Sequence, residues 1–270
     1  MASAVKAETR KDPSRTVILE RPRDHVALVS LNRPDARNAV NAQMANALEA
    51  QVQSLEADPQ IWCVVLTGAG NQAFCAGADL KEVSAGRLDS LWTASAGFAG
   101  FVLAKRKKPW IAAVNGFALA GGFEIALACD LIVAETDAAF GLPEVTRGMV
   151  AAAGGLFRLP RALPRAIAME LIATGGRLGA ARAAAFGLIN KVVPRGHAVE
   201  AALDLAGQIT CNAPIAVRES LEVARQAIDL SVDELAALSA ATQELVRKTD
   251  DFREGPLAFI EKRAPRWCGR

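Results

Sequence analysis

The stretch WIAAVNGFALAGGFEIALACDLIVAET, residues 110–136, decides how this chain folds. Its two ends are nearly continuous apolar runs, which are typical of β-strands buried on both faces. Between them, the small residues around Gly121 and Gly122 predict a turn that leads into an apolar helix. Glu124 follows in this helix. A buried carboxylate without a partner is costly or takes up a proton, so Glu124 either has a hidden partner or serves a function.

Further strand candidates alternate with helices on both sides of this stretch. Residues 26–32, 61–68 and 188–194 read as strands, and residues 41–59 read as a helix with apolar side chains on one face. The alternation predicts an α/β architecture with largely parallel strands. From about residue 197 the pattern is helical only. We therefore expect a flexible tail (1–15), a core that holds the active site (16–196) and a C-terminal helical region (197–270).

Composition and charge exclude several classes of protein. The chain has 270 residues, 51% of them hydrophobic, which is enough for one large core, and a net charge of +2, which is low for a nucleic-acid-binding protein. We expect the basic run 105–108 to be the solvated end of a helix. The scattered cysteines, the polar N-terminus and the interrupted apolar stretch 109–136 favour a reduced, cytoplasmic protein without a membrane span.

Several kinds of catalytic site lack the necessary residues. His25 and His197 are the only histidines, no GxSxG motif is present, and no cluster has the spacing of metal ligands, so we expect no bound metal. GAGNQA, residues 68–73, fits the GxGxxA dinucleotide fingerprint. A helix does not follow it directly and no acidic strand end appears at the required distance, so this alternative is weak.

Two loops share the order of buried strand, Gly-rich turn and helix start. One is TGAGNQAFCAGADL, residues 67–80, which turns at Gly77 and Ala78; the other turns at Gly121 and Gly122. The first backbone N–H groups of a helix have no intrahelical acceptor, and small residues let a ligand carbonyl approach them. Two such donors would form an oxyanion hole, suited to a thioester whose oxygen gains charge as an enolate forms.

A second carboxylate, Glu144, occurs in the apolar loop AFGLPEV, residues 139–145. Two carboxylates in apolar surroundings repel each other and bind protons more tightly, which suits both to proton transfer near neutral pH. Structural roles remain open at this point. Glu124 could pair with a buried arginine, and Glu144 could cap a helix or pair with Arg147.

Four motifs together resemble the enoyl-CoA hydratase/isomerase (crotonase) superfamily over residues 25–270. They are AFCAGADLKE (73–82), KPWIAAVNGFALAGGFEIALACDLIVA (108–134), AAFGLPEVTRGMVAAAGGLFRLPR (138–161) and EGPLAFIEKR (254–263). The resemblance implies an α/β crotonase (ClpP-like) spiral of repeated ββα units with a C-terminal helical trimerisation region. It also implies a homotrimer or a dimer of trimers. The motifs are closest to enoyl-CoA hydratases and carnitinyl-CoA dehydratases.

The resemblance assigns roles to individual residues of this chain. The catalytic residues are Glu124 and Glu144, and the oxyanion hole consists of the N–H groups of Ala78 and Gly121. The substrate and coenzyme A contacts are Ala36, Arg37, Ala76, Ala78, Asp79, Leu80, Lys81, Gly122, Phe259 and Lys262, the last two from a neighbouring subunit in many members. One departure is Asp35, where the family often has a basic residue, so either a phosphate contact is lost there or Arg37 replaces it.

The implied activity is that of an enoyl-CoA hydratase, a hydro-lyase of fatty acid metabolism and β-oxidation. Such an enzyme adds water reversibly and in syn geometry to a 2-enoyl-CoA to give a 3-hydroxyacyl-CoA. No cofactor is implied, because coenzyme A enters as part of the substrate. One alternative is a carnitinyl-CoA (crotonobetainyl-CoA) dehydratase. An alternative from another class is a catalytically silent scaffold that binds acyl-CoA, against which the presence of both glutamates argues.

Overall fold

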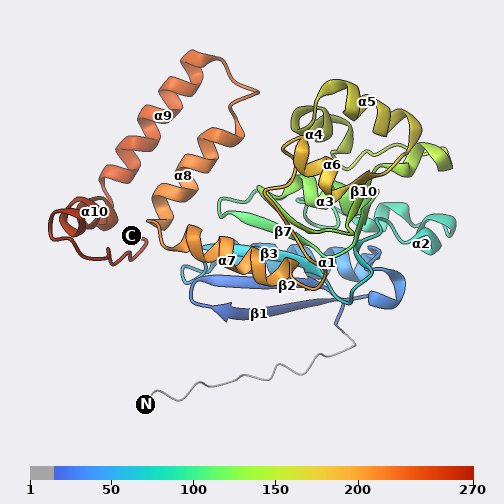
Figure 1. Cartoon of the computed structure of the whole chain (residues 1–270), viewed down its shortest axis with the longest axis horizontal. Coiled ribbons are helices and arrows are strands. Elements are labelled where there is room, and N and C mark those ends of the chain that lie inside the picture. The colour runs from blue at the N-terminus through green and yellow to red at the C-terminus, as the bar shows by residue number, and fades with distance from the viewer. Residues whose placement is uncertain (1–14) are drawn as a thin grey trace.

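A computed structural model describes residues 15–270, and the predicted flexible tail, apart from Arg15, lies outside the described residues. Figure 1 shows the course of the chain. The strands and helices are β1 (Val17–Arg23), β2 (Val26–Leu31), α1 (Ala42–Ala57), β3 (Cys63–Gly68), β4 (Ala73–Cys75), α2 (Leu80–Ser84), β5 (Trp92–Thr93), β6 (Gly97–Phe98), β7 (Trp110–Val114), β8 (Phe117–Leu119), α3 (Gly121–Ala128), β9 (Leu131–Glu135), β10 (Ala139–Gly141), α4 (Gly155–Ala162), α5 (Arg165–Thr174), β11 (Leu178–Gly179), α6 (Ala180–Ala185), β12 (Lys191–Val193), α7 (Ala198–Thr210), α8 (Pro214–Arg225), α9 (Val232–Arg247) and α10 (Asp250–Ile260), with 3₁₀ turns η1 (Pro34–Ala36), η2 (Leu88–Leu91) and η3 (Pro143–Arg147).

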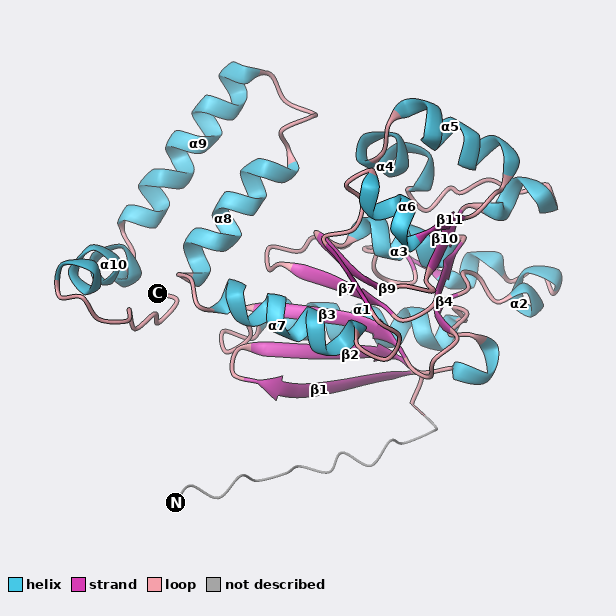
Figure 2. Ribbon diagram, viewed as in Figure 1, coloured by secondary structure: helices cyan, strands magenta, loops and turns pink. Residues whose placement is uncertain are grey.

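Two sheets form the core of the fold. The first has six strands in the order β1-β2-β3-β7-β9-β12, all parallel except β1. The second has the order β11-β10-β8-β4 and runs across the end of the first (Figure 2). Along the chain, a strand of the first sheet is followed three times by a strand of the second: β3 by β4, β7 by β8, and β9 by β10. This alternation confirms the predicted spiral of ββα units.

The central strands are apolar along their whole length because both of their faces are covered. Every residue of β3 and β7 is buried. One face of the first sheet packs against α1, α3 and the second sheet, and the other face packs against α7. The predicted apolar stripe of the 41–59 helix is confirmed, since Met44, Leu48, Val52 and Leu55 of α1 are all buried.

A close approach between a helix and a strand explains the second glycine of the Gly121-Gly122 pair. A Cβ atom on Gly122 would lie 2.0 Å from the backbone oxygen of Cys75, a separation that no real Cβ atom shows. The absence of a side chain therefore lets α3 lie directly on β4. This contact brings the turn before α3 next to the turn that follows β4.

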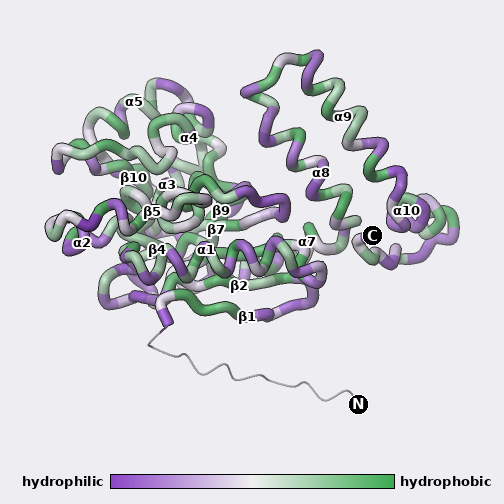
Figure 3. Tube along the Cα trace, turned by 180° about the vertical axis from the view of Figure 1, so that it is seen from behind, coloured by the Kyte–Doolittle hydropathy of each residue, from purple (hydrophilic) through white to green (hydrophobic). Residues whose placement is uncertain are grey.

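The last three helices lie beside the spiral rather than on it. Helix α7 packs on the first sheet, whereas α8, α9 and α10 extend to one side, as Figure 1 shows. Figure 3 shows apolar residues concentrated in the spiral and mixed with polar residues along α8–α10. The division at residue 197 stays a prediction, because α7 lies after that residue and yet covers the core. Among residues 15–270 no helix is both long and apolar enough to cross a membrane.

The prediction for the basic run 105–108 was wrong. These residues form a loop before β7, and Lys108 is 1% exposed. Its Nζ donates to the backbone oxygens of Leu55 and Asp58 at the end of α1. Arg106 donates to the backbone oxygens of Phe101 and Ala128. A helix C-terminus exposes unpaired carbonyl groups that attract cations, so half of this run satisfies backbone acceptors inside the protein.

Candidate active site

The two predicted oxyanion turns touch each other. A Cβ atom on Gly77, whose φ is +92°, would lie 3.0 Å from the backbone nitrogen of Gly121. Within residues 15–270, the N–H groups of Ala78 and Gly121 donate to no backbone or side-chain acceptor. Two neighbouring turns thus present free amides, which is the arrangement that stabilises a developing oxyanion.

Hydrogen bonds hold the second of these turns in a strained conformation at Ala120. Ala120 has φ 53° and ψ −132°, a conformation that L-residues rarely adopt. Its N–H donates to the oxygen of Gly141, and its own oxygen accepts from the amides of Phe123 and Glu124. Strained backbone of this kind persists where the surroundings fix it and is concentrated at functional sites. Here it sets the direction of the next amide, that of Gly121.

Glu124 is 3% exposed on the first turn of α3. Its Oε1 accepts a hydrogen bond from the amide of Gly155, 2.8 Å away. Burial is the main cause that raises the pKa of Glu124 to about 7; the charge of Glu144 raises it further, and hydrogen bonds from the backbone oppose the rise. No ion pair to a buried arginine forms among the described residues. The carboxyl group is therefore divided between its two protonation states near neutral pH.

Glu144 lies in η3 and is 8% exposed. Its Oε2 is buried and has no hydrogen-bond partner. Burial raises the pKa of Glu144, while the charge of Arg147 opposes the rise. The guanidinium of Arg147 hydrogen-bonds Pro143 and Thr146 instead of the Glu144 carboxylate. A buried carboxylate oxygen without a partner is rare in native structures and indicates a group that a ligand completes.

The chain brings most of the predicted coenzyme A contacts together. The amide of Ala76 donates to the oxygen of Arg37, and the amide of Asp79 donates to the oxygen of Val40, so residues 37–40 lie along residues 76–79. Arg37 and Asp35 line a cavity of 140 Å³ at one side of this contact. Asp79 caps α2 by accepting from the amide of Lys81. Leu80 and Lys81 follow, and Ala36 ends η1.

Two predicted contacts lie elsewhere. Phe259 is 85% exposed on α10, and Lys262 is exposed just after it. In Figure 1, α10 and α2 are at opposite ends of the molecule. One copy of the chain therefore does not bring Phe259 and Lys262 to Ala78 or Glu124.

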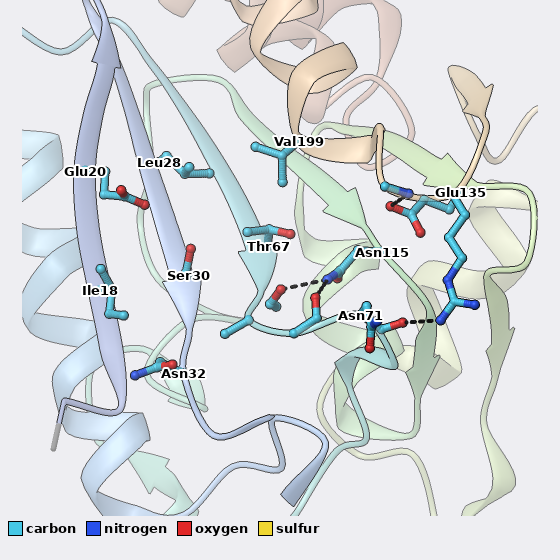
Figure 4. Close-up of a pocket in the computed structure, with 15 residues that line it drawn as sticks. Ile18, Glu20, Leu28, Ser30, Asn32, Thr67, Asn71, Asn115, Glu135 and Val199 are labelled. Atoms are coloured by element: carbon cyan, nitrogen blue, oxygen red, sulfur yellow. Dashed lines mark hydrogen bonds between the residues drawn. The ribbon is translucent and has the colours of Figure 1, made fainter. Parts of the chain in front are cut away.

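A second cavity, of 470 Å³, shares residues 69–71 with the small cavity that Arg37 and Asp35 line (Figure 4). It opens beside the N-terminus of α7 and is lined by residues such as Thr67, Asn115 and Glu135 at the ends of β3, β7 and β9. None of the predicted site residues lines it. The free amides and the two buried carboxylates, rather than this cavity, mark the candidate active site.

The structure adds residues that the sequence interpretation missed. Gly155 binds Glu124, Arg33 donates to Asp79 across 2.9 Å, and the ring of Phe98 occupies the place that a Cβ atom on Gly121 would need. Although burial opposes it, the bonds from Arg33 and from the amide of Lys81 hold the pKa of Asp79 below its usual value. The sequence contains a signal for Gly155 alone among these residues: a Gly-Gly pair lies at the start of α4, as Gly121-Gly122 does at the start of α3.

Comparison with known proteins identifies the same family that the sequence motifs resemble. The family model for enoyl-CoA hydratase/isomerase matches residues 21–270. A carnitinyl-CoA dehydratase of Proteus mirabilis (strain HI4320) is 40% identical over 253 residues, which are 92% of this chain and 97% of that protein.

Solved structures agree with the family match. The crystal structure of an enoyl-CoA hydratase from Mycobacterium tuberculosis H37Rv superposes with a TM-score of 0.90 at 44% identity, over 95% of this chain and 100% of the other. That of a carnitinyl-CoA hydratase from Mycobacterium avium has a TM-score of 0.76 at 49% identity, over 95% of this chain and 99% of the other.

Proposed function

The chain belongs to the enoyl-CoA hydratase/isomerase family, and from this premise we propose that it is a hydro-lyase that adds water to 2-enoyl-CoA thioesters. The product is the 3-hydroxyacyl-CoA, and the reaction is reversible. The observation that carries the proposal is the unpartnered Oε2 of buried Glu144, beside a second buried carboxyl group whose pKa is about 7.

We assign the thioester oxygen to the amides of Ala78 and Gly121. Both amides are free, and they project from neighbouring turns. When water adds to C3 of the enoyl group, negative charge moves onto the thioester oxygen, and these donors stabilise the enolate. The strain at Ala120 supports this role, because it sets the donor before the substrate arrives.

We assign the proton transfers to Glu124 and Glu144. The ionised carboxylate takes a proton from water as the water oxygen bonds to C3, and the protonated carboxyl group gives its proton to C2. The sum is one water added, with the two carboxyl groups exchanging protonation states. Their coupled ionisation leaves open which glutamate does which. We place both carboxyl groups on the same side of the substrate, which makes the addition syn.

We extend the proposal to coenzyme A and to assembly. The segments around Arg37 and Lys81 hold the nucleotide, with Phe259 and Lys262 supplied by a neighbouring subunit of a trimer or a dimer of trimers. The high exposure of Val232, Phe259 and Ile260 supports burial against another copy. We propose no metal or redox cofactor, because the amides stabilise the enolate. The free cysteines and the coenzyme A substrate support a cytoplasmic location within fatty acid metabolism.

Carnitinyl-CoA dehydration is a second candidate, supported by the names of the relatives from Proteus mirabilis and Mycobacterium avium. The same two carboxyl groups and two amides would serve it in the direction of water loss. The candidates differ in the acyl group rather than in the chemistry.

A panel of substrates tests both candidates. Purified protein is mixed with 2-enoyl-CoA thioesters of increasing chain length and with crotonobetainyl-CoA, and the loss of the enoyl thioester absorbance is followed. We expect turnover of at least one substrate, and the highest kcat/KM identifies the acyl group. Binding of acyl-CoA without turnover of any substrate would instead support the silent scaffold.

A further inference from the structure

Arg158, on α4, connects two segments that surround the candidate active site. Its Nη2 donates to the oxygen of Val102 over 2.6 Å, and its Nη1 lies 3.3 Å from the oxygen of Ala153. Val102 follows β6, whose Phe98 ring packs on Gly121. Ala153 precedes the turn that binds Glu124. One guanidinium thus joins the oxyanion side of the site to the carboxylate side.

The turn at Gly154 is shaped around this guanidinium. Gly154 has φ +114°, and a Cβ atom there would lie 1.9 Å from Nη1 of Arg158. The next amide, that of Gly155, is the donor to Oε1 of Glu124. Fixing the oxygen of Ala153 therefore fixes the turn whose amide orients the glutamate.

Charged groups from several elements act on Glu124 and Arg158. Glu124 experiences Glu144 of η3, which disfavours its ionised form, and Arg158 of α4, which favours it. Arg158 experiences the positive charges of Arg106 and Arg161 and the opposite influence of Glu124. Within this set Arg158 is the cation that acts on Glu124.

We propose that Arg158 is a positioning residue for the reaction: it holds the turn whose amide orients Glu124 and places its positive charge near this carboxyl group. The inference rests on the proposed function. It concerns a residue whose guanidinium binds the backbone oxygens of Val102 and Ala153 and acts on the reaction through the turn that holds Glu124.

The test compares Arg158→Met, Arg158→Lys and the matched control Arg161→Met. Arg161 is three residues along α4, but it forms an exposed ion pair with Asp229. The first readout is the pH dependence of kcat/KM, which reports the free enzyme's acid and base. The second is the infrared band of the Glu124 carboxyl group followed against pH, with Glu124→Gln to assign the band. This second readout needs no turnover.

Loss of the cation makes the proton on Glu124 harder to remove. In Arg158→Met we expect the infrared midpoint of Glu124 to rise, because the positive charge of Arg158 favours the ionised form of this carboxyl group. The limb of the rate profile that Glu124 sets moves up with it, and KM changes less than kcat. Arg158→Lys retains the charge and stays close to the parent, and Arg161→Met is unchanged.

A folded Arg158→Met with the parent's infrared midpoint would overturn the proposal. Should that variant not fold, Arg158→Gln, which removes the charge but keeps a polar side chain, takes its place, and a parent midpoint in that folded variant would equally contradict the proposal. Failure of the proposed function has a different signature. The parent protein would then turn over no enoyl-CoA, while the infrared comparison would still report whether Arg158 acts on Glu124.

Discussion

At the scale of single residues, buried Glu124 forms no ion pair among the described residues. The carboxyl group accepts one backbone hydrogen bond, lies near a second buried carboxyl group and has a pKa of about 7. A structural ion pair would have lowered that pKa and kept the carboxylate permanently charged. The observed environment keeps the group able both to give and to take a proton.

Replacement of either Glu124 or Glu144 tests directly whether that residue transfers protons in the reaction. Glu124→Gln and Glu144→Gln each keep shape and remove the proton-transfer group, so we expect kcat to fall by about 10²-fold or more. Binding of a non-reactive acyl-CoA, measured by calorimetry, should be largely kept. A variant that retains more than about a third of the parent kcat would show that its glutamate is not catalytic.

The raised pKa of Glu124 also predicts a change of stability with pH. Between its ordinary value of 4.5 and about 7, the folded protein holds the proton more tightly than the unfolded chain. The contribution of Glu124 to stability is thus complete below pH 4.5 and declines as the pH rises through 7. Glu124→Gln removes the decline, so its unfolding free energy relative to the parent should increase over this window by at most about 3 kcal/mol.

Urea unfolding at fixed protein concentration, repeated at several pH values, measures this difference. Glu170→Gln is the control, because Glu170 is about half exposed on α5 beside Arg182. A difference between Glu124→Gln and the parent that does not change from pH 4 to pH 8 would contradict the raised pKa.

At the scale of elements, local pattern predicted the parts that depend on local rules. Continuous apolar runs became the buried strands β3, β7 and β9, and the Gly121-Gly122 pair began α3. The basic run 105–108 failed because its burial depends on carbonyl groups of α1, some fifty residues earlier in the chain. Arg158 and Gly155 were missed for a similar reason. Their partners Val102 and Glu124 are distant in sequence, and no periodicity records such pairs.

The start of α3 offers a test of the oxyanion assignment. Gly121→Pro removes the N–H donor, but any Cβ atom there also meets the Phe98 ring, 2.4 Å away. Gly121→Ala has the same clash and retains the donor, so the two variants are compared in a Phe98→Ala background. We expect the proline variant to have a kcat lower than the alanine variant by about 10²-fold or more.

Circular dichroism establishes that both of these variants are folded. A proline can begin a helix, because the first N–H group has no intrahelical acceptor. Equal kcat values for folded proline and alanine variants would remove Gly121 from the oxyanion hole.

At the scale of the whole molecule, one copy of the chain holds an incomplete set of the proposed contacts. The carboxyl groups, the amides and the segments 36–40 and 76–81 meet in the spiral, whereas α10 with Phe259 and the following Lys262 lies at the far side. The C-terminal end is nevertheless well fixed: buried Asp251 accepts from the amides of Cys268 and Gly269. An exposed α10, to which the C-terminal segment is hydrogen-bonded, fits a role in which it reaches a neighbouring subunit.

Lys262→Gln tests that role. If Lys262 binds a phosphate of coenzyme A across a subunit interface, its loss should raise KM for acyl-CoA more than it lowers kcat, because we place the chemistry at Glu124 and Glu144. Lys248→Gln, just after α9, is the control. Light scattering should give the mass of a trimer or a hexamer. A fully active monomer would contradict the shared site, and an unchanged KM in Lys262→Gln would exclude Lys262 as a ligand.

The most direct test of the central claim follows the oxygen atom that the reaction adds. The parent protein is incubated with the best 2-enoyl-CoA substrate in ¹⁸O-labelled water, and the product is analysed by mass spectrometry. We predict one labelled oxygen, located at C3 of a 3-hydroxyacyl-CoA, and its formation should be nearly abolished in Glu144→Gln. An unlabelled product, or equal labelling by the parent and Glu144→Gln, would contradict hydration by the paired glutamates.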